Sequence, residues 1–293
     1  MSKAFNNINI YDIRVHPGDS AYLIDDGETA ILYDSGFGFT GRQIADNIAD
    51  ILKDRQLDYI FLTHSHYDHA LASIAVCDKY PNVTVVASKH AANVFTRPGA
   101  KAVMKRLDKK VAEAYGVTEY DLNTDKLRAD ITVDDGDTVK AGDLSFLALH
   151  LPGHTNCSVG YYCEEKGLLL SCESLGVFDG KDMIIPSVLT GYNAAINSIK
   201  RVCELNPEYI LAPHIGLLTK ESTAYFLSHM QQATENAAEF IANKIRAGIS
   251  DEKIRKEYIK VFCSDFSKEA YPEDAANLNT SIMIELIRKE FNL

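Results

Sequence analysis

The sequence predicts an α/β fold, and two features of the chain carry this prediction. Short apolar runs bounded by turn residues alternate with helix-compatible stretches as far as about residue 214. Such alternation is typical of a layered α/β core. From about Thr219 onward the pattern is nearly all helical. We therefore expect an α/β catalytic domain over residues 1–217 and a helical C-terminal extension over residues 218–293.

The first third of the chain supplies the clearest elements. AYLIDDGETAILYDSG predicts two strands joined by a tight turn at Asp25-Asp26-Gly27, a favourable turn sequence. Further along, a polar helix, a strand, a second helix and a buried strand are predicted from GRQIADNIADILKDRQ, LDYIFLT, residues 70–79 and VTVVAS.

The stretch KAVMKRLDKKVAEAY interrupts the strand pattern and predicts an inserted helix. Its apolar face is expected to hold Val103, Leu107, Val111 and Ala114, with the cations mostly on the other side. Seven cations but only one anion, Asp108, lie between Lys89 and Lys110. This helix either covers the site of an anionic substrate or is a solvated amphipathic helix.

Bulk composition disfavours several classes of protein. The 293 residues carry a formal net charge of -11, which disfavours nucleic acid as a partner. No apolar run is long enough to span a membrane, and the N-terminal stretch lacks the apolar region of a signal peptide, so we expect a soluble cytoplasmic protein. The six cysteines contain no CxxC pair and are expected to be buried, reduced thiols.

The stretch THSHYDHA concentrates potential metal ligands in six residues. His64 and His66 follow a predicted strand, and Asp68 and His69 fall at the start of the next helix. Four polar side chains at a buried strand end would need many hydrogen bonds in a plain hydrophobic core. The spacing H-x-H-x-D-H therefore predicts ligands for one or two cations.

Three further candidates follow later strands. His154 lies in LPGHT, Glu173 follows LLLSC, and His214 closes YILAPH. In open α/β folds, functional groups collect just beyond the ends of strands. Their shared position and their order predict that they complete the metal site.

These motifs, with ILYDSG before them, resemble the ordered motifs of the metallo-β-lactamase superfamily over roughly residues 5–217. The resemblance implies an αββα sandwich with a dinuclear site at one edge. It implies that Asp34 of ILYDSG orients a ligand and that Glu173 bridges the two metals. It assigns three ligands to each metal: His64, His66 and His154 to the first, and Asp68, His69 and His214 to the second.

One position departs from the family pattern, because the bridging acid is usually aspartate and here it is Glu173. The additional methylene extends the carboxylate by roughly 1.5 Å. Either the backbone lies further back, or Glu173 binds mainly one metal.

The expected activity is metal-dependent hydrolysis. Five histidines and two carboxylates suit two divalent transition metals, with zinc favoured and iron or manganese as alternatives. A metal-bound hydroxide would attack a small ester, thioester or lactone, and Asp68 would orient the nucleophile and shuttle its proton. The substrate is expected to be a small molecule, with anionic molecules among the candidates. The alternatives are a phosphodiesterase or nuclease, a di-iron redox protein, and a catalytically weak ligand-binding regulator; the oligomeric state is left open.

Overall fold

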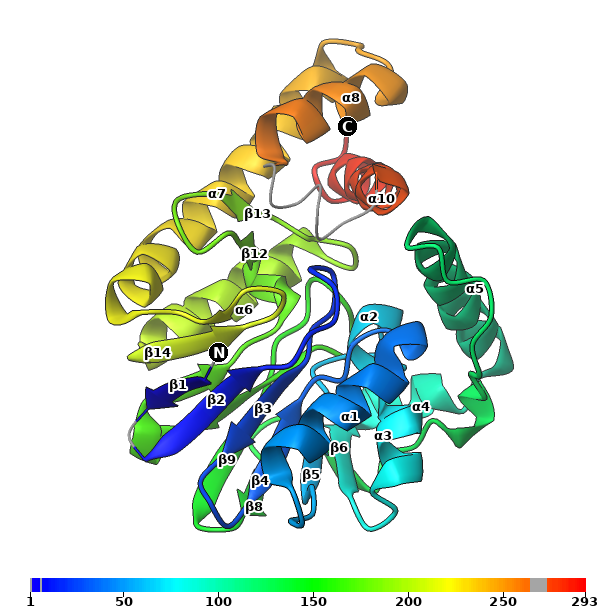
Figure 1. The fold of residues 1–293 in the computed structure, drawn as a ribbon. Helices are drawn as coiled ribbons and strands as arrows, with labels where there is room; N and C mark the ends of the chain where they lie inside the picture. The colour runs from blue at the N-terminus through cyan, green and yellow to red at the C-terminus, as the bar shows by residue number, and fades with distance from the viewer. Residues whose placement is uncertain (1, 6, 264–272) are drawn as a thin grey trace. The chain divides into compact units, whose positions relative to one another are not determined.

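Seven strands form the first sheet of the computed structural model, which describes residues 2–5, 7–263 and 273–293 (Figure 1). In sheet order they are β1 (Ser2–Phe5), β2 (Ile8–Asp12), β3 (Tyr22–Asp25), β4 (Ala30–Tyr33), β5 (Tyr59–Phe61), β6 (Thr84–Ser88) and β7 (Ile131–Val133). Pairing is antiparallel from β1 to β4 and parallel from β4 to β7. The predicted hairpin is confirmed, since β3 and β4 pair across a turn in which Asp26 N donates to Thr29 O over 3.2 Å.

A second, antiparallel sheet packs against the first. Its strands in this part of the chain are β8 (Thr138–Ala141), β9 (Leu144–His150), β10 (Val159–Cys163) and β11 (Leu168–Leu170). The Phe61 ring of β5 lies 5.1 Å from the Phe146 ring of β9 and 4.8 Å from the Tyr161 ring of β10, between centroids. The buried Tyr161 hydroxyl donates to Leu62 O over 2.9 Å. The core between the two sheets is thus largely aromatic and aliphatic.

The helices that accompany these sheets follow the predicted order. They are α1 (Gly41–Leu52), α2 (Tyr67–Ala70), α3 (Ser73–Lys79), α4 (Lys89–Phe95) and α5 (Pro98–Ala114), with 3-10 turns η1 (Gly38–Thr40), η2 (Thr124–Lys126) and η3 (Glu164–Lys166). Helix α1 buries Ile44, Ile48 and Leu52, four residues apart and so on one face. The helix expected over residues 70–79 is divided into α2 and α3.

Helix α5 is the predicted inserted helix, but its predicted apolar face is only partly correct: Val111 is buried and Leu107 is half-buried, whereas the other two residues are exposed. The buried side chains are Met104, Asp108, Val111 and Ala112, whereas Val103 is 44% exposed and Ala114 is exposed. Asp108 determines this face, because its carboxylate accepts hydrogen bonds from Gly38 N and from the Tyr120 hydroxyl, each over 2.7 Å. Periodicity of apolar residues alone cannot identify a face that buries a charged side chain.

The rest of the chain holds the helical extension and several short strands. Its elements are η4 (Glu173–Leu175), β12 (Val177–Phe178), β13 (Ile184–Ile185), α6 (Tyr192–Leu205), β14 (Tyr209–Ala212), β15 (Gly216–Leu217), α7 (Lys220–Arg246), α8 (Asp251–Phe262) and α10 (Glu273–Glu290). Helices α7, α8 and α10 share a hydrophobic core that includes Ile241, Ile254 and Ile284. The predicted helical character beyond residue 219 is confirmed for the described residues 220–263 and 273–293.

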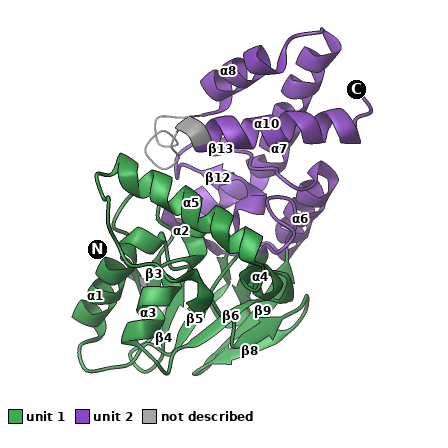
Figure 2. Ribbon diagram, turned by 90° about the vertical axis from the view of Figure 1, so that its right-hand side faces the viewer, with its two compact units in different colours: residues 1–150, 159–170 green, residues 151–158, 171–293 purple. Residues whose placement is uncertain are grey.

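The chain divides into two compact units (Figure 2). Unit 1 comprises residues 1–150 and 159–170, and unit 2 comprises residues 151–158 and 171–293. The functional boundary expected at residue 217 stays a prediction, since this division follows packing and not activity. Among the described residues, no helix has both the length and the apolar character needed to cross a membrane.

Candidate metal centre

The histidine stretch of unit 1 follows strand β5, as the sequence predicts. The residue preceding α2 is His66, with extended backbone angles (φ -73°, ψ 154°), and Asp68 and His69 lie in the helix's single turn. The ring centroid of His64 lies 4.6 Å from that of His66 and 4.1 Å from that of His69. His64 and His69 are fully buried, and Asp68 is 8% exposed. Unit 1 therefore brings these four predicted ligands together.

Asp34 anchors this cluster from the end of strand β4. Its buried carboxylate accepts hydrogen bonds from Ser20 Oγ (3.0 Å), Thr63 N (2.9 Å) and Thr63 Oγ1 (3.0 Å). It also lies 2.7 Å from His69 Nδ1. Asp34 has a φ of 50°, an uncommon backbone angle for a residue with a side chain, which this set of hydrogen bonds maintains.

These contacts determine which nitrogen of each ring carries the proton. The Asp34 carboxylate accepts from His69 Nδ1, which leaves the lone pair on Nε2, 3.6 Å from Asp68 Oδ2. Thr63 Oγ1 donates its proton to Asp34, so the same oxygen accepts from His64 Nδ1 over 3.0 Å. Both imidazoles are thereby oriented through Nδ1, as is usual for histidines that bind a metal through Nε2.

The loop LPGHT of unit 2 holds His154 by its backbone. His154 N donates to Ser174 Oγ over 3.1 Å. Gly153 has a φ of 142°, and a Cβ at this position would lie 2.6 Å from the Ala195 backbone. Only glycine fits this close approach of the loop to helix α6.

The His154 ring repeats the arrangement seen in unit 1. Its Nδ1 lies 3.0 Å from Ser187 O, and because a carbonyl oxygen only accepts, Nδ1 carries the proton. Ser187 Oγ lies 2.9 Å from the same nitrogen. The opposite nitrogen, Nε2, lies 3.0 Å from Glu173 Oε2.

Glu173 lies between two histidines of unit 2. Its second oxygen, Oε1, lies 3.6 Å from Nε2 of His214, which follows strand β14 with a φ of 64°. Glu173, His154 and His214 are at most 2% exposed. Glu173 begins the turn η4 and directs each carboxylate oxygen toward a different imidazole, an arrangement suited to contact with two cations.

The donor set of each unit fits a metal. Each set combines imidazoles with carboxylates in a buried setting, and such groups suit zinc, manganese or iron. In His64, His69 and His154, an oxygen acceptor lies beside Nδ1. Buried carboxylates beside imidazole Nε2 atoms are costly to maintain unless a proton or a cation balances them.

Sequence reasoning did not identify two residues that orient these ligands. Thr63 lies in the motif THSHYDHA, directly before the candidate ligand His64, so its role could have been predicted from its position. Ser187 is 33 residues from His154 and belongs to no recognisable motif. The histidines outside the two ligand sets make other contacts: His16 stacks on Tyr115, His90 on His150, and His229 Nδ1 lies 2.8 Å from Tyr225 O.

The six cysteines are free thiols in the described part of the chain; Cys157, Cys163 and Cys172 are buried as the sequence predicts, whereas the other three are only half-buried. Burial raises the pKa of the Cys77 and Cys163 thiols to about 11. These two thiols are therefore protonated at neutral pH and are not suited to bind a metal as thiolates.

Comparison with known proteins agrees with this description. The family model of the metallo-beta-lactamase superfamily matches residues 18–214. The metallo-beta-lactamase fold-containing protein ST1585 of Sulfurisphaera tokodaii is 25% identical over 244 residues, which is 81% of this chain and 87% of that protein. Glyoxylase B2 of Dictyostelium discoideum is 27% identical over 165 residues, 56% of this chain and 49% of that protein. The crystal structure of TTHA1429, a metallo-beta-lactamase family protein from Thermus thermophilus, has a TM-score of 0.63 at 16% identity and covers 97% of this chain and 89% of its own.

The chain belongs to the metallo-beta-lactamase superfamily, because the family model spans most of its length. The αββα sandwich with an inserted helix and a helical C-terminal extension is its fold. All seven predicted ligands lie within the residues that the family model matches.

Proposed function

We propose that this protein is a metal-dependent hydrolase that binds two divalent transition metals and cleaves a small ester, thioester or lactone. The proposal places His64, His66, His154 and Glu173 around one ion, and Asp68, His69 and His214 around the other, with Glu173 also reaching the second. The observation that carries it is that each compact unit holds a set of candidate ligands with histidines oriented through Nδ1, namely His64 and His69 in unit 1 and His154 in unit 2. Zinc is the favoured metal, with iron or manganese as alternatives.

When bound, such ions lower the pKa of a coordinated water to about 7 and polarise the oxygen of a carbonyl. The protein's own residues then have separate tasks. Asp34, Thr63 and Ser187 hold imidazole rings in one orientation, so the ligand geometry is in place before substrate arrives.

Asp68 is the residue assigned to proton transfer. Its carboxylate is 8% exposed, so it is accessible to a water molecule while lying 3.6 Å from His69 Nε2. Its oxygen would orient the attacking water, accept its proton and return that proton to the leaving group. No serine or cysteine nucleophile is needed.

Three considerations support the choice of substrate class. The relative in Dictyostelium discoideum is named as a glyoxylase, although it is similar to only about half of this chain. A helical segment after the last ligand, here α7, α8 and α10, also resembles the arrangement in glyoxalase II and in related thioesterases and lactonases. The net charge of -11 disfavours a nucleic-acid substrate.

The test combines metal analysis with a panel of substrates. We expect about two equivalents of metal per chain, and turnover of generic ester, thioester or lactone substrates that exceeds turnover of a phosphodiester. His64→Ala combined with His154→Ala should abolish activity, whereas His90→Ala, which removes an exposed histidine outside the ligand sets, should not. Full activity in metal-free protein would refute the metal site, and preferential phosphodiester cleavage would refute the substrate class.

A further inference from the structure

Helices α2 and α3 are separated directly after the candidate ligands Asp68 and His69. In a continuous α-helix each carbonyl accepts from the N–H group four residues later, so Asp68 O would accept from Ala72 N. Instead, Asp68 O accepts from Ser20 N over 3.2 Å. Ala72 N donates to Gly36 O, also over 3.2 Å. The break between the two helices therefore begins at the backbone of a candidate ligand.

The hydroxyl of Ser35 occupies the next position in this break. Ser35 Oγ accepts from Ser73 N over 2.9 Å and donates to His69 O over 2.8 Å. Ser35 N also donates to His69 O, over 2.7 Å. Because His69 and Ser73 are four residues apart, Ser35 Oγ lies between two groups that a continuous helix would join directly. A side chain inserted into the helical hydrogen bonds in this way interrupts the helix.

His69 is consequently held at its ring and at its backbone by two consecutive residues. Its Nδ1 lies 2.7 Å from Asp34 Oδ2, and its carbonyl oxygen accepts from Ser35. Both Asp34 and Ser35 are fully buried. The direction of His69 Nε2, the nitrogen left for a metal, depends on both contacts.

The segment that contains Ser35 has a fixed backbone shape. Asp34 and Gly36, on either side of Ser35, have φ angles of 50° and 85°. A Cβ at Gly36 would lie 2.6 Å from Asp19 Oδ1, which accepts from Phe37 N over 2.8 Å. The contacts of this segment with Asp19 therefore place Ser35 Oγ in the break independently of any metal.

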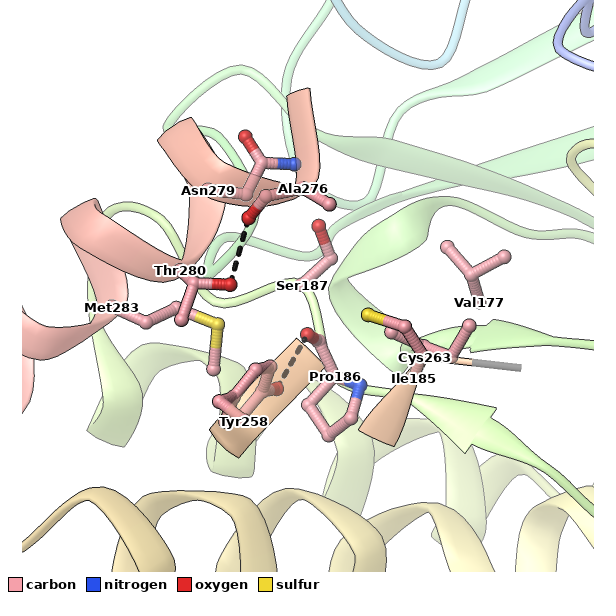
Figure 3. Close-up of a pocket in the computed structure, with 10 residues that line it drawn as sticks. All are labelled: Val177, Ile185, Pro186, Ser187, Tyr258, Cys263, Ala276, Asn279, Thr280 and Met283. Atoms are coloured by element: carbon pink, nitrogen blue, oxygen red, sulfur yellow. Dashed lines mark hydrogen bonds between the residues drawn. The ribbon is translucent and has the colours of Figure 1, made fainter. Parts of the chain in front are cut away.

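A similar hold at ring and backbone exists in unit 2. His154 N donates to Ser174 Oγ over 3.1 Å, and His154 Nδ1 lies 3.0 Å from Ser187 O. Ser187 lines a small cavity of about 40 Å³ (Figure 3), so a replacement at Ser187 has space to move. Ser35 is fully buried, which makes Ser35 the better position at which to test such a hold.

We propose that Ser35 is a positioning residue of the second candidate metal site, which consists of Asp68, His69 and His214. The inference rests on the proposed function and deepens it, since it names a residue that sets the ligand geometry of one ion. Ser35 keeps the helix open at His69. Without the Ser35 hydroxyl, His69 O accepts from Ser73 N, α2 and α3 join, and two of the ligands turn away from the ion.

The test compares two serine hydroxyls of the same break by zinc titration of metal-free protein in a calorimeter. Ser35→Ala should raise the Kd of the second ion by about 10- to 100-fold and that of the first ion by less than about threefold. Ser73→Ala is the matched control and should keep both affinities, because Ser73 Oγ donates to Ala70 O over 2.6 Å. His214→Ala, which removes a ligand of the second site only, identifies the binding step of the second ion.

Two further variants separate positioning from general stability. Ser35→Thr retains a hydroxyl and should bind the second ion within about tenfold of wild type. If Ser35→Ala does not fold, Ser35→Cys, whose thiol is a weaker donor, should show the same preference for the second ion to a smaller degree. Wild-type affinity for the second ion in Ser35→Ala, or equal weakening of both ions, would overturn the proposal.

A measurement on the helix break does not depend on metal or turnover. Crystal structures of the metal-free proteins should show His69 O within hydrogen-bonding distance of Ser73 N in Ser35→Ala but not in Ser73→Ala. An unchanged break in Ser35→Ala would contradict the role of Ser35. If wild-type protein binds both ions but hydrolyses no ester, thioester or lactone, the proposed function fails while the role of Ser35 is still decided by the titration.

Discussion

Glu173 shows at the scale of one residue how a departure from a family pattern can be accommodated. The superfamily usually places aspartate here, and the longer side chain raised the question of whether it reaches both metals. The backbone enters η4 at this residue, and the two carboxylate oxygens lie 3.0 Å from His154 Nε2 and 3.6 Å from His214 Nε2. This geometry favours Glu173 as a ligand shared between the two candidate metal sites.

Replacing Glu173 tests that role directly. Glu173→Ala removes an anionic ligand and should weaken binding of at least one ion by more than the 10- to 100-fold typical for loss of an outer hydrogen-bonding partner. Glu173→Asp should retain both ions if the backbone can follow the shorter side chain. Metal titration by calorimetry measures both, with the exposed Glu164→Ala as control. Two ions bound by Glu173→Ala with unchanged affinity would show that Glu173 is not a ligand.

The sequence predicted the ligands better than it predicted their partners. The seven candidate ligands follow predicted strands or begin a helix, and such positions can be read from periodicity and motif order. Asp34 was identified through the family resemblance alone, and its contacts with Thr63 and His69 join residues 29 and 35 apart in sequence. Ser187 could not be predicted, because its role depends on a packing contact that no local pattern encodes.

Helix α5 shows what can and cannot be predicted at the scale of an element. Its existence and cationic character follow from the sequence, but its buried face does not. Asp108 is fully buried on that face and accepts from Gly38 N and the Tyr120 hydroxyl. Burial raises the pKa of the Asp108 carboxyl to about 7, and nearby Asp19 adds to this effect.

This raised pKa predicts a pH-dependent contribution to stability. Between pH 4 and 7 the folded state binds a proton at Asp108 that the unfolded state does not. The stabilisation of the folded state by protonated Asp108 is therefore fully present below about pH 4 and is lost as the pH rises through about 7. Asp108→Asn is neutral throughout, so wild type should lose stability relative to this variant from pH 5 to 7, by up to about 1.4 kcal/mol per pH unit. Urea unfolding at each pH measures the free energy of unfolding of wild type and of Asp108→Asn. Asp121→Asn serves as control, because the Asp121 side chain is 82% exposed. A difference that does not change with pH would contradict the assignment.

The cations of α5 lead to a separate prediction about substrate charge. Lys105, Arg106 and Lys109 lie on the helix that packs against α2, which carries Asp68 and His69. If the substrate is anionic, replacing these three cations by alanine should raise KM severalfold at low salt and much less at high salt, because charges near the surface are screened. Lys140→Ala, at an exposed site on β8, serves as control. An unchanged KM at low salt would indicate that α5 is only a solvated amphipathic helix.

At the scale of the whole molecule, the order of elements was predictable but their division into units was not. Alternating strands and helices followed by a helical segment correctly predicted the class of fold. The two compact units separate residues 151–158 from the strands on either side of them. That division depends on long-range pairing, such as Val159 N donating to Thr63 O over 2.9 Å, which no local periodicity reveals.

Metal binding should therefore contribute to the stability of the whole chain. Under the proposed function, ligands from unit 1 and unit 2 bind the same ions, and these ligands extend from His64 to His214 in sequence. An ion that binds only the folded state at 100 times its Kd stabilises it by about 2.7 kcal/mol. At about 2–4 °C per kcal/mol for a large domain, chelation should lower the Tm by roughly 5–10 °C, and added zinc should restore it.

The control for this effect is a protein that has lost ligands from both units. His64→Ala combined with His214→Ala should have a low Tm that chelation does not lower further, because the affected ions no longer bind. Differential scanning calorimetry with metal analysis of each sample measures both quantities together. If wild-type protein shown to be free of metal unfolds at the same temperature as the loaded protein, the two ligand sets do not hold ions jointly. In that case each unit's histidines and carboxylates must be balanced by protons within their own set.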